Sequence, residues 1–197
     1  MTSTQLTFLS TYPSPASRMT AALQAWLPVM LCASIFAVES TAAFGADHTS
    51  APLHNFFQLI LGAAADHNWS DIHHIIRKTG HFTGYGLFSL VCFRGFWLTL
   101  RKSASRFNRG LVCQCASHAL AIAATFLVAG ADELHQSFLP NRTGLFSDVL
   151  LDTAGAIAVQ FATFLILTAI AAWPRRPANQ AHAKIHAERQ RKLPRAA

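Results

Sequence analysis

The chain alternates between long apolar segments and shorter polar connections. Four apolar segments, residues 21–38, 80–100, 111–131 and 149–173, approach or exceed the roughly 20 residues that an α-helix needs to cross a bilayer. Hydrophobic residues make up 52% of the 197 residues and charged residues only 13%, whereas charged residues form about a quarter of a soluble domain. The pattern therefore predicts an all-α polytopic membrane protein with four transmembrane helices in one bundle.

The polar segments outside the predicted bundle differ in composition. Residues 1–20 are rich in Ser, Thr and Pro, so we expect a disordered segment before the membrane domain at 21–173. Residues 174–197 form a basic tail. The first loop, 39–79, is too long for a simple connection. Within it we expect a short helix in the membrane interface, because helical spacing aligns five apolar residues: Leu53, Phe56, Phe57, Ile60 and Leu61.

The basic residues outside the predicted spans are unevenly distributed. With both termini and the second loop inside, twelve Lys and Arg lie on the inner side and three on the outer side. Cytoplasmic loops of membrane proteins carry this excess. We therefore expect a multi-pass protein of the bacterial inner membrane with both termini in the cytoplasm. The outer face then carries the loops 39–79 and 132–148.

Three other interpretations are less well supported. The formal charge of +7 would suit nucleic acid, but beside four spans the basic tail is better explained by contact with anionic lipid. The first apolar segment is longer than a cleaved signal, so we expect a retained helix. Four cysteines fall within or at the inner ends of spans and lack zinc-site spacing, so free thiols are expected.

Ionisable residues gather at the predicted outer ends of the last three spans. Lys78, His81 and Tyr85 are spaced to share one helical stripe. The same holds for Asp132 with Gln136, beside Glu133, and for Asp148 with Asp152, whose stripe continues through Gly155. Pro140 and Gly144 supply a turn that we expect to direct Arg142 toward the carboxylates. Such groups are costly at the edge of a bilayer, so this cluster is the predicted working part of the protein.

The charge of this cluster needs compensation. Its four acids face only two fixed cations, Lys78 and Arg142, and two acids four residues apart on a buried face do not both stay ionised unaided. A protonated carboxyl, a bound cation or water would supply what is missing. A metal site drawing on His81, His135 and the acids is conceivable. Since no ligand spacing is diagnostic, we predict no metal and no cofactor.

Two blocks of residues resemble the VanZ-like family of bacterial integral membrane proteins, whose namesake is linked to teicoplanin resistance. The similarity covers residues 26–159. The matching positions are Lys78, His81, Phe82, Tyr85, Asp132, Glu133, Gln136, Pro140, Arg142 and Asp148, followed by Asp152 and Gly155. Many members have Glu where this chain has Gly84, and position 152 is often Asn. The resemblance implies an envelope protein connected with glycopeptide susceptibility, without implying a reaction.

Three functions are compatible with these features. The first is binding of a lipid-linked envelope precursor or a lipoglycopeptide in the outward-facing pocket, with Arg142 and Lys78 meeting anionic groups. The second is an enzyme acting on an envelope lipid, with His81 or Glu133 as base, Asp132 or Asp148 as acid and Arg142 stabilising negative charge. The third is a structural network in a scaffold or in one half of a transporter, although no internal repeat is visible. No nucleophile motif supports the enzyme, and the oligomeric state stays open.

Overall fold

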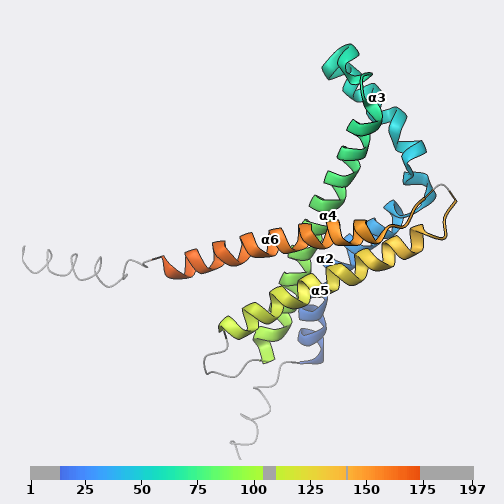
Figure 1. The fold of residues 1–197 in the computed structure, drawn as a ribbon. Coiled ribbons are helices and arrows are strands. Elements are labelled where there is room, and N and C mark those ends of the chain that lie inside the picture. Colours follow the sequence, from blue (N-terminus) through green and yellow to red (C-terminus); the bar gives the residue numbers. More distant parts are fainter. Residues whose placement is uncertain (1–13, 104–109, 141, 174–197) are drawn as a thin grey trace, which may run out of the picture. The chain divides into compact units, whose positions relative to one another are not determined.

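The computed structural model describes residues 14–103, 110–140 and 142–173. Helices are the only regular elements in these ranges, so the predicted all-α class is confirmed for them (Figure 1). They are α2 (Pro15–Glu39), η1 (Ala42–Phe44), α3 (Ala46–Leu61), η2 (Gly62–Ala65), α4 (Trp69–Ser103), α5 (Gly110–Gln136) and α6 (Phe146–Ala172). Contacts divide the chain into two units, Met1–Thr163 and Phe164–Ala197. Every contact described below lies within the first unit.

Helix α2 begins six residues before the predicted span because its start is well capped. The Ser14 side chain accepts a hydrogen bond from the Ser17 amide at 3.2 Å, and Pro15 occupies the first helical position, where a missing N–H does no harm. Residues 14–20, which were expected to be disordered, thus belong to the cap and first turns of a helix. Residues 1–13 and the basic tail, 174–197, lie outside the described residues.

The first loop contains more helix than its sequence predicted. Helix α3 spans 16 residues, compared with the nine expected at 53–61. It ends at Gly62, whose φ of 57° is accessible to glycine at little cost. The expected apolar face is present in part: Phe56, Ile60 and Leu61 are exposed on the helix surface.

Within the described residues, three helices are long and apolar enough to cross a membrane: α2, α5 and α6. These three match the first, third and fourth predicted spans and indicate a membrane protein. The second predicted span, 80–100, falls within α4, which runs for 35 residues without a break. Helix α4 lacks the same apolar character because charged and polar residues such as Lys78, His81 and Arg94 interrupt it.

The core forms where α2, α5 and α6 pack against α4. It contains Tyr85, Phe88, Cys92, Ala121, Ala129 and Val149. Glycine permits a very close approach between α4 and α6, because a Cβ on Gly155 would lie 2.1 Å from the carbonyl oxygen of Phe82. This crossing brings the polar ends of both helices together. The role predicted for Gly155, close approach of a neighbouring helix, is therefore confirmed.

Candidate functional site

The polar stripe of α4 contacts a different carboxylate with each of its members. Lys78 forms an ion pair with Asp148. One turn further, His81 Nδ1 lies 3.4 Å from Asp152 Oδ2. Another turn on, the Tyr85 hydroxyl donates to Asp132 Oδ2 at 2.8 Å. The structure thus brings together residues from three helices that the sequence placed on three separate stripes.

The two acids of α6 have different surroundings. Asp148 lies in the first turn of the helix, where the helix dipole favours negative charge, and Lys78 neutralises it further. Asp152 lies one turn deeper and is 0% exposed. His81 is the one hydrogen-bonding partner of Asp152 among the described residues, and 3.4 Å is long for such a bond. The deeper carboxylate is therefore poorly compensated.

The end of α5 supplies the rest of the predicted site. Glu133 Oε2 accepts a hydrogen bond from the backbone amide of Leu145 at 2.9 Å, which ties the end of α5 to the start of α6. Gln136 Oε1 accepts from Arg142 at 3.3 Å. Both Glu133 and Gln136 are buried. All nine predicted site residues therefore lie in one continuous region of the first unit.

Arg142 differs from its predicted role. Its Nη2 donates to the backbone carbonyls of Glu39 and Thr41, each at 2.8 Å, and its Nη1 donates to Gln136. It therefore fastens the end of α2 to the α5–α6 loop instead of pairing with a carboxylate. Both carbonyls lie where α2 ends and η1 begins, and the Thr41 carbonyl also accepts a hydrogen bond from the Phe44 amide. Backbone carbonyls at a helix end are available as acceptors for such a side chain. Burial, and then the nearby charge of Arg77, lower the pKa of Arg142 below its usual value, although a guanidinium stays charged.

Several residues in this region were not singled out from the sequence. Ser40 Oγ lies 2.8 Å from His135 Nδ1, joining the ends of α2 and α5 across 95 positions of sequence. Phe36 stacks on Tyr85 with ring centroids 4.4 Å apart and also faces Gly84. Arg77 precedes Lys78 and lines two hollows of the site. Arg77 had a sequence signal in its position beside Lys78, whereas Ser40 and Phe36 had none.

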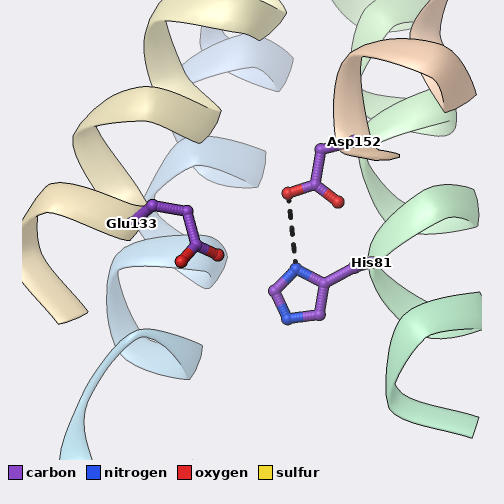
Figure 2. Close-up of side chains that lie close together, drawn as sticks. All are labelled: His81, Glu133 and Asp152. Carbon is purple, nitrogen blue, oxygen red and sulfur yellow. Dashed lines mark hydrogen bonds and ion pairs between the residues drawn. The ribbon is translucent and has the colours of Figure 1, made fainter. Parts of the chain in front are cut away.

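Three of these side chains meet in the space between α4, α5 and α6. His81, Glu133 and Asp152 each offer one ligand atom, and these atoms lie within 4.8 Å of one another. Figure 2 shows the imidazole and the two carboxylates, each from a different helix, around a common gap. His135, the other histidine considered for a metal, is engaged with Ser40 instead. The sequence predicted no metal site, and the structure groups a set of residues that could hold one.

The site retains buried polar atoms without hydrogen-bond partners. Among the described residues they include Asp132 Oδ1, Asp152 Oδ1 and Arg142 Nε. Unpaired polar atoms of this kind cost roughly 1–3 kcal/mol each. Asp132, Glu133 and Asp152 also have no Lys or Arg within ion-pair distance in the described part of the chain. The unpaired carboxylate oxygens are suited to contact a bound cation, and Arg142 Nε is suited to donate to a bound anion.

Hollows of contrasting character surround the cluster. A cavity of about 440 Å³ lies between α2 and α5; its lining is mainly apolar and ends at Ser40, Asp132 and His135. We call it the apolar groove. A second hollow, of about 200 Å³, is lined by Arg77, Lys78, His81, Glu133, Gln136, Arg142 and Asp148, among others. We call this the polar pocket. A smaller hollow of about 40 Å³, lined by His81, Tyr85 and Asp132, lies beside them.

Comparison with known proteins identifies a family for this chain. The family model described as VanZ/LLP1 matches residues 21–167, which include every predicted site residue. No curated protein and no solved structure matches the chain. Because the family model covers about three quarters of the sequence, the chain belongs to the VanZ-like family.

Proposed function

We propose that this protein binds an anionic amphiphile of the cell envelope, with the acyl or prenyl chain in the apolar groove and the head group in the polar pocket. The single observation that carries the proposal is that these hollows share lining residues. Asp132 lines both the apolar groove and the small hollow, and His81 and Gln136 line both the small hollow and the polar pocket. An apolar cavity that ends in charged groups matches a molecule with a chain and a charged head.

The charge of the head group is inferred from two arginines. Arg77 and Arg142 both line the polar pocket and also a hollow of about 180 Å³. The charge of Arg77 lowers the pKa of Arg142. Two guanidinium groups this close repel one another, and an anion between them would remove the repulsion. Arg142 Nε is buried without a partner and is available to donate to such an anion. Lys78, initially considered for this role, is engaged with Asp148.

The chain of the amphiphile is inferred from the groove. Its lining includes Ala33, Phe36, Ala37, Val128 and Ala131, and its volume of about 440 Å³ falls in the range of small-molecule sites, roughly 300–1,000 Å³. A lipid-linked envelope precursor consists of an apolar chain and an anionic head group, as the groove and the pocket require. A lipoglycopeptide also carries an acyl chain on a polar head, which would connect the site with glycopeptide susceptibility.

The proposal includes an arrangement in the membrane. Helix α4 would be a fourth span over 80–100, with its polar stripe shielded by α5 and α6, and α3 would lie in the outer interface. The basic residues then place both termini in the cytoplasm of a bacterial cell and the site on the outer side of the inner membrane. Arg94 donates to the carbonyl of Gln24, which would occupy its charge near the inner side.

Binding assays with matched ligands test the proposal. We would titrate the purified full-length protein in detergent with a polyprenyl monophosphate, with the polyprenyl alcohol of the same length and with teicoplanin. We expect Arg77→Gln and Arg142→Gln each to weaken phosphate binding at least tenfold, about 1.4 kcal/mol, and to leave alcohol binding unchanged. Ala131→Phe, which fills the groove, should weaken both prenyl ligands.

Arg94→Gln is the matched control, because Arg94 lies on α4 roughly 25 Å from Arg77 at 1.5 Å per helical residue. It should bind the phosphate as the wild type does. If the phosphate binds no more tightly than the alcohol, or if Arg94→Gln weakens binding as much as Arg142→Gln does, the head-group assignment is wrong. If neither prenyl ligand nor teicoplanin binds, the proposed function is wrong.

One observation favours catalysis as a second candidate. A buried carboxylate, Asp152, lies 3.4 Å from Nδ1 of His81, and a carboxylate on this side of the ring would support a histidine that acts as a general base through its other nitrogen. Incubating the purified protein with a labelled lipid-linked precursor would reveal turnover, and His81→Gln should abolish it. Binding without turnover would support amphiphile binding and exclude catalysis of this precursor.

A further inference from the structure

The cluster of His81, Glu133 and Asp152 has the composition and spacing of a metal site. The three candidate ligand atoms lie within 4.8 Å of one another. An ion held at about 2.1 Å by each ligand keeps the ligand atoms roughly 3.0–3.4 Å apart. The side chains therefore need to move inward by only about 1 Å, which rotation about side-chain bonds provides without moving a helix.

A second observation, independent of this spacing, concerns Asp152. The residue is 0% exposed, yet its Oδ1 has no hydrogen-bond partner and its Oδ2 has only the long contact with His81. A buried carboxylate normally acquires a cation, several hydrogen bonds or a proton. Lys78 pairs with Asp148 instead, and Arg142 donates to carbonyls and Gln136. The protein side chains therefore leave this charge uncompensated.

The ligand set distinguishes among metals. One imidazole with two carboxylates suits Zn²⁺ or Mn²⁺, while Mg²⁺ and Ca²⁺ prefer oxygen ligands alone. Three protein ligands leave at least one coordination position open, and His81 and Glu133 both line the polar pocket, through which an ion or a ligand atom can reach that position. The backbone amide of Leu145 holds the second oxygen of Glu133, as hydrogen bonds from the surroundings commonly do for metal-binding carboxylates.

We infer that His81, Glu133 and Asp152 bind one divalent transition-metal ion between α4, α5 and α6. The ion neutralises two adjacent buried carboxylates and links α4, α5 and α6 at one point, in addition to contacts such as those of Lys78 with Asp148 and Tyr85 with Asp132. Its open position faces the polar pocket. This inference does not depend on amphiphile binding, because the same three residues would hold the ion in the absence of any lipid.

Isothermal titration calorimetry with Zn²⁺ tests the inference on the purified full-length protein, produced without a histidine tag and first stripped with a chelator. The chain has ten histidines, so weak additional binding is expected and the variants identify the specific site. We expect one tight equivalent in the wild type. His81→Gln, Glu133→Gln and Asp152→Asn should each weaken that equivalent at least tenfold. Asp71→Asn, an exposed acid at the start of α4, is the matched control and should bind as the wild type does.

A spectroscopic measurement separates ligand loss from misfolding. Co²⁺ bound in place of Zn²⁺ should give visible absorption bands, and each variant of the three should lose them while keeping the wild-type elution volume and helical circular dichroism. Glu133→Gln and Asp152→Asn preserve shape, so the test remains valid if His81→Gln fails to fold. The inference is overturned if the wild type has no such equivalent, or if its affinity stays within threefold in any of the three variants. Equal loss in Asp71→Asn also overturns it. Amphiphile binding is measured separately, so either conclusion can fail without the other.

Discussion

Helices α4, α5 and α6 are joined by two buried polar networks, one near the middle of the helices and one at their polar ends. The middle network is a chain of hydrogen bonds that contains no carboxylate. Gln160 Nε2 donates to Ser89 Oγ at 2.9 Å, Gln160 Oε1 lies 2.6 Å from His118 Nδ1, and Ser89 Oγ donates to the carbonyl of Gly86 at 2.6 Å. Both functional groups of the Gln160 side chain are thereby used.

The network at the polar ends contains three carboxylates, and its hydrogen bonding is incomplete. Asp132, Glu133 and Asp152 lie together without a basic partner in ion-pair range among the described residues, and Asp132 and Asp152 each retain an oxygen without a hydrogen bond. Helix packing alone would be served better by amide and hydroxyl contacts such as that of Gln160 with Ser89. The difference between the two networks supports the proposal that the outer one binds a ligand, whereas the middle one joins the helices.

The largest loss of stability is expected when the close crossing of α4 and α6, which supports both networks, is disrupted. In Gly155→Val, a Cβ would lie 2.1 Å from the carbonyl oxygen of Phe82, so α4 and α6 must separate. We expect a loss of about 3 kcal/mol or more in the free energy of unfolding, with low yield and a lower melting temperature in detergent. Gly130→Ala is the control, since a Cβ there meets nothing within 4 Å. Wild-type stability of Gly155→Val would show that the close crossing is absent.

Paired neutral substitutions should affect the two networks in opposite ways. Gln160→Leu removes the amide group that donates to Ser89 and contacts His118 and should cost about 2 kcal/mol of stability. Asp152→Asn removes a poorly compensated buried charge and should leave stability unchanged or raise it, while ligand or metal binding is lost. Thermal unfolding and binding measured on the same preparations would test this. Equal destabilisation by both variants would mean that the outer network is structural as well.

Removing one hydroxyl from the outer network should have a smaller effect. Tyr85→Phe deletes the hydrogen bond to Asp132 Oδ2 and should cost about 1 kcal/mol, the net value of a typical hydrogen bond. Thr83→Val is the comparison variant, because the Thr83 hydroxyl bonds only to its own helix backbone. Chemical denaturation should detect the first change and not the second. A larger loss in Thr83→Val would contradict the assigned contacts.

The smallest effect concerns pH at the junction of α3 and α4. His73 stacks on Trp69 and contacts Thr49. Burial, followed by the charges of Arg77 and His74, lowers the pKa of His73 below its ordinary 6.5. The unfolded segment therefore binds protons more readily, so the stability of this junction is complete above pH 6.5 and declines as pH falls toward the lowered pKa.

Fluorescence of Trp69 between pH 7.5 and 5 measures this decline, provided the other three tryptophans are replaced by Phe. His73→Gln should remove the pH dependence, and His74→Gln, at the exposed neighbouring position, should leave most of it. A pH response that persists unchanged in His73→Gln would assign it to another group.

The sequence predicted the outer network better than the connections around it. Helical spacing alone placed Lys78, His81 and Tyr85 on one stripe and Asp148 with Asp152 on another, and the structure pairs these stripes. Periodicity reports the face on which a residue lies, but it does not report a partner far away in the sequence. The contact of Ser40 with His135 was therefore not foreseeable.

Two sequence predictions, for Arg142 and for the start of α2, differ from the structure for clear physical reasons. The expected direction of Arg142 was wrong because the backbone carbonyls of Glu39 and Thr41 at the end of α2, over 100 positions earlier in the chain, compete with the carboxylates as acceptors. The start of α2 was misplaced because composition suggested disorder, whereas Ser14 and Pro15 together form a good helix cap. Local capping chemistry was visible in the sequence and was outweighed by the polar composition.

Side-specific labelling of Thr143→Cys would test most directly whether the cluster forms a ligand pocket open to the outside. Thr143 lines the polar pocket, and the four native cysteines would first be replaced. We predict that a membrane-impermeant maleimide labels Thr143→Cys in intact cells, that polyprenyl phosphate slows this labelling in purified protein, and that Gly110→Cys reacts only after permeabilisation. Labelling of Thr143→Cys only after permeabilisation, or at a rate the phosphate does not change, would contradict the account.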